Sequence, residues 1–146
     1  MLEQNIFAGF GGQGMLLIGE FLAYAGMIEN KHVSWLPSYG PEMRGGTANC
    51  SVVVSDSPIA SPVITKASCV VAMNRPSLDK FEQAVRPGGM LIVNSSLIDR
   101  KAERSDIDVF YVPANEIAAL FDRFNGLPFY YERNFLFRFI RGTIAR

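Results

Sequence analysis

The glycine-rich turn near the N-terminus constrains the fold most strongly, because apolar segments flank it on both sides. Ile6-Phe7-Ala8 predicts a short buried strand, and Gly9-Phe10-Gly11-Gly12-Gln13-Gly14 follows it with the spacing G-x-G-x-x-G. Apolar and small residues from Met15 to Met27 then predict a helix with nearly all of its faces buried. A strand, a glycine turn and a helix in this order are typical of a sheet with helices packed against it.

The rest of the chain continues this alternation. Further strands are expected at His32–Leu36, Ala48–Ser55, Cys69–Met73, Met90–Val93 and Val109–Val112. Pro37 is expected to end the first of these strands, and Ser55-Asp56-Ser57-Pro58 predicts a turn. The pattern predicts an α/β fold, a Rossmann-like three-layer sandwich with a mostly parallel central sheet.

Two helices are expected in the second half of the chain. The first has Asn74 as a cap and Pro76 in its first turn, and it is expected to run to about Arg86. Pro87-Gly88-Gly89 is expected to stop this helix. The second is a short helix that begins at about Ala114.

Composition excludes several classes of protein. The chain has 146 residues, of which 49% are hydrophobic and 19% charged, with a formal net charge of zero. These values indicate a globular domain and give no electrostatic argument for nucleic acid or an anionic membrane as a partner. Gly19 and Glu20 interrupt the longest apolar stretch, and no signal-peptide pattern precedes it, so a cytoplasmic protein is expected.

Cysteine and histidine are too few for the common metal sites. Cys50 and Cys69 are the only cysteines, and their apolar or small neighbours favour buried, reduced thiols. A C-x-x-C pair is absent and His32 is the only histidine, so neither an iron–sulfur cluster nor a zinc site is expected in this chain.

The glycine turn by itself leaves three interpretations open. Gly9 allows a tight turn, Gly11 allows close approach to a ligand, and Gly14 is expected to let the helix pack close to the sheet. An NAD or FAD site also needs an acidic residue about 20 positions further on. That region contains no carboxylate, and Glu29 lies before the expected strand. The turn therefore serves a dinucleotide, another phosphate or pyrophosphate, or strand–helix packing alone.

A long loop from Ser38 to Gly46 contains three glycines and a proline. It is expected at the carboxyl edge of the sheet, where α/β proteins place their ligand crevices. Arg44 is either a clamp for phosphate or carboxylate or the partner of Glu42 in a salt bridge that orders the loop. Tyr39 is either an interface anchor or a residue that packs within the loop.

Four blocks of sequence closely resemble one protein family, the gamma subunits and gamma domains of the 2-oxoacid:ferredoxin oxidoreductases of the pyruvate, 2-oxoglutarate and ketoisovalerate type. The resemblance covers residues 5–118 and is strongest in the second block, which is long and unusual in composition. The blocks are Gly9-Phe10-Gly11-Gly12-Gln13-Gly14, His32-Val33-Ser34-Trp35-Leu36-Pro37-Ser38-Tyr39-Gly40-Pro41-Glu42-Met43-Arg44-Gly45-Gly46-Thr47-Ala48-Asn49-Cys50, Ala72-Met73-Asn74-Arg75-Pro76-Ser77-Leu78-Asp79 and Pro113-Ala114-Asn115-Glu116-Ile117-Ala118.

The resemblance implies a subunit that is not self-sufficient as an enzyme. The family's complexes oxidatively decarboxylate a 2-oxoacid, transfer the acyl group to coenzyme A and reduce ferredoxin. Thiamine diphosphate, magnesium and iron–sulfur clusters are expected on alpha and beta catalytic partners and on a ferredoxin-like delta chain. The overall resemblance favours 2-oxoglutarate or branched-chain substrates. The alternative is a free-standing Rossmann-like module that binds coenzyme A or another nucleotide without catalysis.

Within this resemblance the chain is assigned no catalytic residue and no metal ligand. A surface facing the acyl-transfer site is expected, and it either contacts coenzyme A or docks the partner chains. Its expected residues are Gly9, Gly11, Gly12, Gln13, Gly14 and Arg44 for coenzyme A, and Tyr39, Glu42 and Met43 for the interface. The family's arrangement argues against Glu42 as the activator of thiamine diphosphate.

The resemblance ends near Ala118, so the chain is divided into a gamma-type domain, 1–118, and an atypical C-terminal segment, 119–146. From Arg123 onward the chain has five arginines, one glutamate and many aromatic residues. A divergent interaction tail, a truncation or a frameshift each explains this change. Phe135, Phe137 and Phe139 alternate as in a strand, whereas Phe135 and Phe139 also have the i, i+4 spacing of a helix. If this segment leaves an apolar face of the core exposed, the chain is expected to form oligomers with itself. A chain altered in this way is also an alternative interpretation, in which assembly with the alpha and beta chains is lost.

Overall fold

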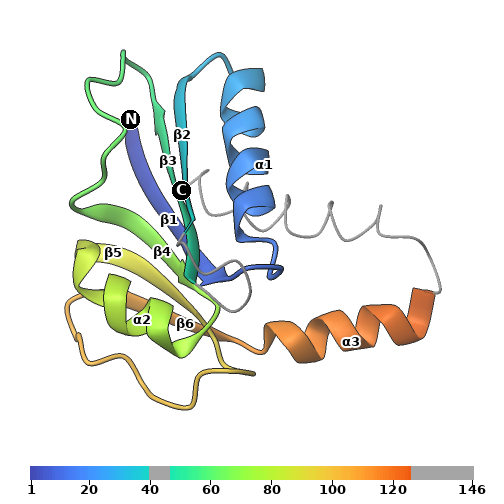
Figure 1. Cartoon of the computed structure of the whole chain (residues 1–146). Coiled ribbons are helices and arrows are strands. Elements are labelled where there is room, and N and C mark those ends of the chain that lie inside the picture. Colours follow the sequence, from blue (N-terminus) through green and yellow to red (C-terminus); the bar gives the residue numbers. More distant parts are fainter. Residues whose placement is uncertain (40–46, 126–146) are drawn as a thin grey trace.

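The computed structural model describes residues 1–39 and 47–125, and these residues form one sheet with helices on its two faces (Figure 1). The strands are β1 (Leu2–Phe10), β2 (His32–Tyr39), β3 (Thr47–Ser55), β4 (Ala67–Ala72), β5 (Val85–Asn94) and β6 (Asp108–Val112). The helices are α1 (Met15–Ile28), α2 (Arg75–Phe81), the 3₁₀ turn η1 (Glu82–Ala84) and α3 (Ala114–Asn125). The predicted α/β class and the order of the elements are confirmed.

The sheet has the strand order β2-β3-β1-β4-β5-β6. Strands β1, β4, β5 and β6 pair in parallel, whereas β3 is antiparallel to both of its neighbours. The sheet is therefore mostly parallel, as predicted. One feature departs from the simplest alternation: β3 folds back between β1 and β2, so β2 becomes the edge of the sheet.

Helix α1 packs on the β1–β3 half of one face through small residues. A β-carbon added at Gly19 would lie 2.3 Å from Cys50 Sγ, and one added at Gly26 would lie 2.8 Å from Val33 Cγ2. The two glycines are seven positions apart and thus lie on the same side of the helix. They allow the helix backbone to approach strands β2 and β3 closely.

A Schellman motif ends α1. Asn30 has a left-handed conformation with φ of 57°. The N–H of Lys31 donates to the carbonyl of Gly26 at 3.0 Å, and the N–H of Asn30 donates to that of Met27 at 3.0 Å. These two bonds satisfy carbonyl groups of the last turn and direct the chain into β2.

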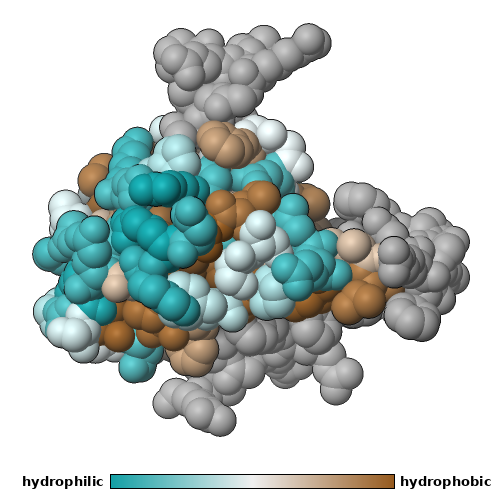
Figure 2. Space-filling model, turned by 90° about the horizontal axis from the view of Figure 1, so that it is seen from below, coloured by the Kyte–Doolittle hydropathy of each residue, from teal (hydrophilic) through white to brown (hydrophobic). Residues whose placement is uncertain are grey.

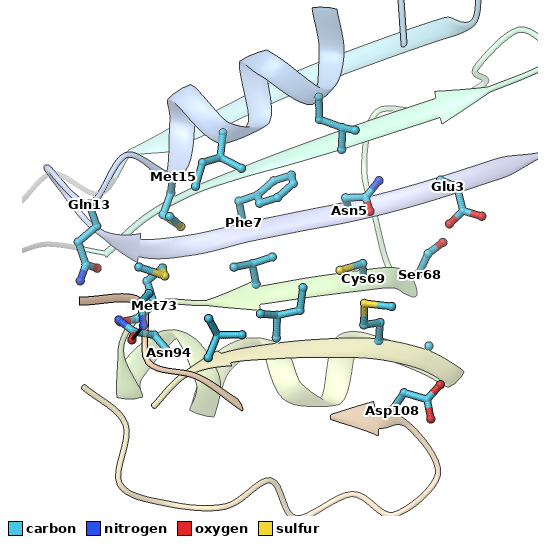
Figure 3. Close-up of a pocket in the computed structure, with 18 of the residues that line it drawn as sticks. Glu3, Asn5, Phe7, Gln13, Met15, Ser68, Cys69, Met73, Asn94 and Asp108 are labelled. Atoms are coloured by element: carbon cyan, nitrogen blue, oxygen red, sulfur yellow. Dashed lines mark hydrogen bonds between the residues drawn. The ribbon is translucent and has the colours of Figure 1, made fainter. Parts of the chain in front are cut away.

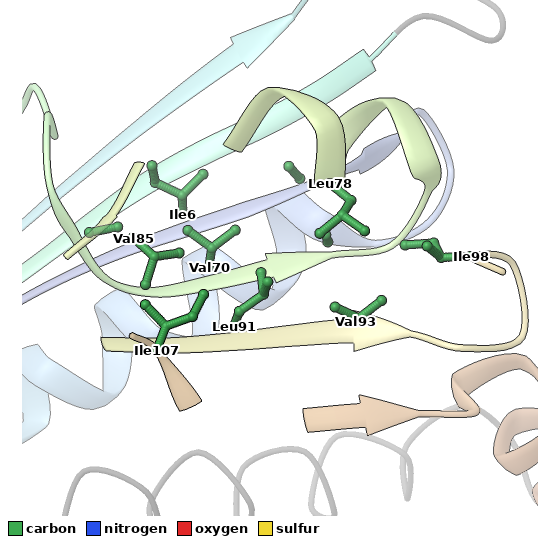
Figure 4. Packing of buried hydrophobic residues seen from close by; sticks show 11 residues of the cluster. Ile6, Val70, Leu78, Val85, Leu91, Val93, Ile98 and Ile107 are labelled. Carbon is green, nitrogen blue, oxygen red and sulfur yellow. The ribbon is translucent and has the colours of Figure 1, made fainter. Parts of the chain in front are cut away.

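The other face of the sheet carries a second apolar cluster beneath α2 (Figure 4). Successive side chains of β1 point to opposite faces of the sheet, so Ile6 joins this cluster while Phe7 joins the cluster beneath α1. Leu78 of α2 is fully buried against β4 and β5. Asn74 caps α2 as predicted, because its Oδ1 accepts a hydrogen bond from the N–H of Ser77 at 2.9 Å.

Two predicted boundaries are wrong. Pro37 does not end β2, which continues to Tyr39, because an edge strand tolerates a residue without an N–H donor. The helix does not run to Arg86 but ends at Phe81, and Val85 already pairs with Ala67 of β4. The segment Pro87-Gly88-Gly89 lies inside β5, at an irregularity in its pairing with β4.

The early end of α2 has a visible cause in the side chain of Glu82, which is 2% exposed. Its carboxylate accepts hydrogen bonds from Arg100 Nη2 at 2.9 Å and from the N–H groups of Glu103 and Arg104. These bonds hold the connection between β5 and β6 against the end of α2.

Candidate functional site

The glycine turn at the carboxyl end of β1 is closed by its own glutamine. The N–H of Phe10 donates to Gln13 Oε1 at 2.6 Å, and the N–H of Gln13 donates to the carbonyl of Phe10 at 3.2 Å. Gly12 and Gly14 both have positive φ, 92° and 77°, which glycine adopts without strain. Gln13 therefore supports the turn, and its predicted ligand role stays a prediction.

The glycines differ in what each position requires. An added β-carbon at Gly9 would lie 2.7 Å from Gln13 Oε1 and 3.1 Å from Met73 Cβ, so Gly9 is needed for packing. Nothing lies within 4 Å of a β-carbon added at Gly11, Gly12 or Gly14. The expectation that Gly14 allows close packing of the helix is wrong, because Gly19 and Gly26 have that role. The predicted close approach of Gly11 to a ligand stays a prediction.

The N-terminus of α1 faces this open space. Its cap residue is Gly14, which provides no side-chain hydrogen bond, and the first turn contains no acidic residue. The first N–H groups of the helix and its positive dipole end are thus left to solvent or to a ligand. Together with the open backbone at Gly11 and Gly12, they can accommodate an anion such as a phosphate.

The sheet order argues against an NAD or FAD site of the usual kind. In such a site the parallel strand beside β1 ends in the acidic residue that holds the ribose. Here β1 has antiparallel β3 on one side, whose first residue Thr47 pairs with Phe10, and parallel β4 on the other side. Strand β4 is followed by Met73 and Asn74, so neither neighbour of β1 provides an acidic residue at this edge.

The loop predicted to carry Arg44 leaves and re-enters the sheet beside the glycine turn. Tyr39 pairs with Ala48 in β2 and β3, and the neighbouring Thr47 pairs with Phe10 of β1. Both ends of the loop are therefore at the carboxyl edge, as predicted. Residues Glu42, Met43 and Arg44 and the side chain of Tyr39 lie outside the described part, so their assigned roles stay predictions.

An asparagine network at the same edge was missed by the sequence analysis. Asn94, 2% exposed, ends β5, and its Nδ2 donates to Asn115 Oδ1 at 2.9 Å and to the carbonyl of Met73 at 3.4 Å. Its Oδ1 accepts from the N–H groups of Ser96 and Ala114, each at 3.2 Å. Asn94 thus joins the ends of β4 and β5 to the start of α3. Its place directly after an apolar strand was the available signal.

Next to this network, the described structure contains buried polar atoms without a hydrogen-bond partner. They are Asn74 Nδ2, Ser77 Oγ and Ser96 Oγ. Asn74 and Ser77 are 2% and 1% exposed, respectively. Buried donors of this kind carry a cost unless water or another group satisfies them.

A cavity of about 760 Å³ begins beside the turn and extends along the sheet (Figure 3). Gln13, Met73 and Asn94 line its end at the carboxyl edge, and Glu3, Ser68 and Asp108 line the opposite end. The floor between these ends is mostly apolar, with Phe7, Val71, Met90 and Ile92, and it includes one amide, Asn5.

The two thiols have the properties of core residues. Burial raises the pKa of the Cys50 thiol to about 11 and that of the Cys69 thiol to about 12. Cys50 is fully buried and donates to the carbonyl of Met15 at 3.3 Å. Both thiols are therefore protonated at neutral pH, which makes them poor nucleophiles.

The described residues form neither a metal-binding cluster nor a helix that could span a membrane. Within 1–39 and 47–125, His, Cys, Asp and Glu side chains do not gather in groups of three or more that could hold a metal ion. None of the helices in these ranges combines the length and hydropathy needed to cross a membrane.

Comparison with known proteins identifies close relatives. The family model described as pyruvate ferredoxin/flavodoxin oxidoreductase matches residues 4–126. Ketoisovalerate oxidoreductase subunit VorA of Methanothermobacter marburgensis is 45% identical over 111 residues, which cover 76% of this chain and 23% of VorA. 2-Oxoglutarate synthase subunit KorC of Methanocaldococcus jannaschii is 35% identical over 121 residues, which cover 82% of this chain and 65% of KorC.

A solved structure has the same fold. The gamma subunit of a keto/oxoacid ferredoxin oxidoreductase from Geobacter sulfurreducens superposes with a TM-score of 0.65 and 30% sequence identity, covering 76% of this chain and 60% of that subunit. The chain thus spans between about a quarter and two thirds of the length of these relatives. The family resemblance indicated by the four sequence blocks is confirmed.

Proposed function

This chain belongs to the pyruvate ferredoxin/flavodoxin oxidoreductase family, and we propose that it acts as the gamma-type subunit of a multi-subunit 2-oxoacid:ferredoxin oxidoreductase. The complex would decarboxylate a 2-oxoacid, transfer the acyl group to coenzyme A and pass the electrons to ferredoxin. The observation that carries this proposal is the family match over residues 4–126, which extends from β1 to the end of α3.

The proposal assigns the redox chemistry to partner chains. Two cysteines cannot ligate an iron–sulfur cluster that needs four, and the described residues offer no group suited to a metal ion. As the family resemblance implies, we assign thiamine diphosphate, its magnesium ion and the clusters to alpha and beta catalytic chains and to a ferredoxin-like delta chain. This chain contributes to assembly with them in the cytoplasm.

A branched-chain 2-oxoacid is the substrate class that we propose first. VorA, the relative with 45% identity, is named as a subunit of ketoisovalerate oxidoreductase. KorC, with 35% identity, is named for 2-oxoglutarate and gives the second class to test.

For this chain's own chemistry, we propose that the glycine turn holds the diphosphate of coenzyme A. The backbone at Gly11 and Gly12 is open to a ligand, and the uncapped N-terminus of α1 provides N–H donors and a positive dipole end. The absence of an acidic residue from the first turn of α1 removes a source of repulsion toward phosphate. Arg44, on the loop that starts and ends beside the turn, would supply a cation.

A pair of substitutions at Gly12 tests this subsite with matched shape. Gly12 has a φ of 92°, and asparagine and aspartate tolerate that region better than other side chains do. G12N and G12D add side chains of nearly equal size, so they differ mainly in charge. In the complex assembled with its catalytic chains, we expect G12D to raise the KM for coenzyme A at least about tenfold above that of G12N, because a carboxylate repels the diphosphate.

The measurement is 2-oxoacid-dependent reduction of a viologen dye at varied coenzyme A, with size-exclusion chromatography to verify assembly. Equal KM values in G12N and G12D would show that the turn does not contact the diphosphate. Full activity with no requirement for this chain would overturn the subunit assignment itself.

A further inference from the structure

The cavity beside the turn lies on a half of one sheet face over which residues 1–39 and 47–125 place no helix. Many of its lining residues occupy every second position along β1, along β4 with the residue that follows it, and along β5: Glu3, Asn5 and Phe7, then Cys69, Val71 and Met73, then Met90, Ile92 and Asn94. Alternate residues of a strand point to the same face, so these side chains form one continuous floor (Figure 3). Helix α1 contributes only the edge of the cavity, through Met15, Ile18 and Leu22.

This floor has the composition of a core rather than of a surface. Val71 and Ile92 are half-buried at its centre, beside Phe7, which is already buried beneath α1. The neighbouring residues of β4 and β5 that point to the opposite face are buried in the cluster beneath α2. Parallel sheets are normally covered on both faces, because their strands are apolar on both sides. An apolar floor of this size left in water would cost about 25 cal/mol for each Å² exposed.

The chain leaves the described structure at the edge of this floor. Helix α3 begins at the carboxyl end of β6, and its residues Ala114, Ile117 and Ala118 line the cavity. The helix then extends away from the sheet (Figure 1), and its Leu120 is 52% exposed. The face seen from below shows brown apolar residues scattered among teal hydrophilic ones (Figure 2).

The remaining chain is long enough to return. The 12 residues of α3 span about 18 Å at 1.5 Å per residue. The 21 residues 126–146 would reach about 30 Å as a helix and more than twice that when extended, so they can pass the length of α3 and continue across the sheet.

The composition of this segment matches the floor. Phe135, Leu136, Phe137, Phe139 and Ile140 supply large apolar side chains within six residues. The segment 126–146 has four arginines and one glutamate. Glu3, Asp108 and Arg86 line the far end of the cavity, where Arg86 lies 4.0 Å from Glu3, so Asp108 is the carboxylate there that an arginine of the segment can pair with. The apolar floor is therefore the main argument for this occupant.

We propose that the C-terminal segment Leu127–Arg146 folds back over the uncovered half of the sheet and fills this cavity. The segment is then the missing cover of the core, and its divergent sequence still serves the fold. This inference concerns the chain by itself and does not depend on the proposed role in a complex.

Disulfide cross-linking in the full chain tests the proposal directly. In a C50S background Cys69, on the cavity floor, is the only native thiol. One further cysteine is introduced at a time by F135C, F137C, F139C or I140C, and each protein is oxidised with copper phenanthroline at low concentration. We expect at least one variant to form an intramolecular bond with Cys69, identified by peptide mass spectrometry.

The control variant is D99C, because Asp99 lies 3.6 Å from Arg75 of α2, on the opposite face of the sheet. It should remain unlinked under the same conditions. Failure of all four segment variants to link within one chain would overturn the proposal. Links formed only between two chains would also overturn it and would identify a second copy as the cover.

Thiol labelling gives a second measurement. In the same C50S background, a chain ending at Gly126 should label at Cys69 with N-ethylmaleimide at least about tenfold faster than the full chain, because its cover is gone. Equal labelling rates in the two chains would contradict the proposal. The cross-linking series uses full-length protein, so it remains decisive whatever the stability of the shortened chain.

Discussion

Gly19→Ala is the substitution for which the structure makes the sharpest stability prediction. Alanine is normally favoured over glycine within a helix by about 1 kcal/mol. At position 19, however, the new β-carbon would lie 2.3 Å from Cys50 Sγ and 3.2 Å from both Trp35 Nε1 and Val52 Cγ2. The contact with Cys50 therefore decides the sign of the change.

The magnitude follows from how far the two atoms must separate. Ordinary contacts of a β-carbon begin at 3.4 Å, so the helix and Cys50 would have to move apart by about 1.1 Å. Cys50 is 0% exposed and cannot move into solvent. Overpacking of a core costs about 1–3 kcal/mol, and this overlap is at the upper end of that range. After the gain in helix propensity, we expect a net loss of about 2 kcal/mol.

A double-mutant cycle with Cys50→Ala isolates the contact. C50A alone should cost about 1–2 kcal/mol, because it leaves a small cavity and removes the bond to the Met15 carbonyl. In G19A/C50A the added methyl group occupies the space left by the sulfur atom. The coupling between the two sites should then be about 2–3 kcal/mol in favour of the double variant.

Urea denaturation, followed by far-UV circular dichroism and by the fluorescence of Trp35, measures all four proteins. Trp35 is the only tryptophan and lies beside the substituted position, so it reports on this interface. A G19A protein as stable as the parent chain would refute the close packing of α1 on β3. Additive effects in the cycle would show that Cys50 is not the atom in contact.

Three further predictions concern buried polar and titratable groups. E82Q should lower stability by about 2–3 kcal/mol in urea denaturation, because a buried carboxylate that accepts from Arg100 is lost, whereas the exposed control D79N should cost less than about 0.5 kcal/mol. N94D should speed hydrogen exchange at the start of α3, since its carboxylate cannot donate to Asn115 as the amide does. Burial raises the pKa of Cys69 from 9.0 to about 12, so this thiol ionises at a lower pH in the unfolded chain than in the folded chain. The free energy of unfolding is therefore unaffected by this thiol below pH 9, and it falls as the pH rises from 9 toward 12, by up to about 1.4 kcal/mol per pH unit. C69S should accordingly lose less stability than the parent chain between pH 9 and 11.

Local sequence patterns predicted the elements that depend on neighbouring residues. The apolar run Ile6-Phe7-Ala8, the glycine turn and the helix from Met15 are each specified within a few residues, and all three are present. The cap of α2 was predictable for the same reason, because Asn74 bonds to an N–H only three positions away.

The wrong predictions concern features that depend on residues far apart in the sequence. Pro37 was expected to end a strand. The strand β2 accommodates this proline because β2 is at the edge of the sheet, and β2 is at the edge because β3 lies between it and β1. The end of α2 depends on Glu82 meeting Arg100, 18 positions further on. Gly14 was assigned to packing because of the motif, whereas Gly19 has that role through its contact with β3.

The candidate site likewise has a part that local motifs predicted and a part that depends on distant contacts. The glycine turn and the position of the loop ends beside it followed from motif spacing and from the rule that ligands bind at the carboxyl edge. Asn94 was overlooked because its importance arises from contacts with Met73 and Asn115, each 21 positions away. Such a network becomes apparent only when the strand ends are brought together.

Anaerobic affinity purification of this chain from its own cells, with mass-spectrometric identification of bound proteins, tests the central claim most directly. We expect recovery of a thiamine-diphosphate-binding pair of chains and an iron–sulfur chain, together with 2-oxoacid oxidation that depends on coenzyme A. Recovery of this chain alone, or only with copies of itself, would contradict its role as a gamma-type subunit.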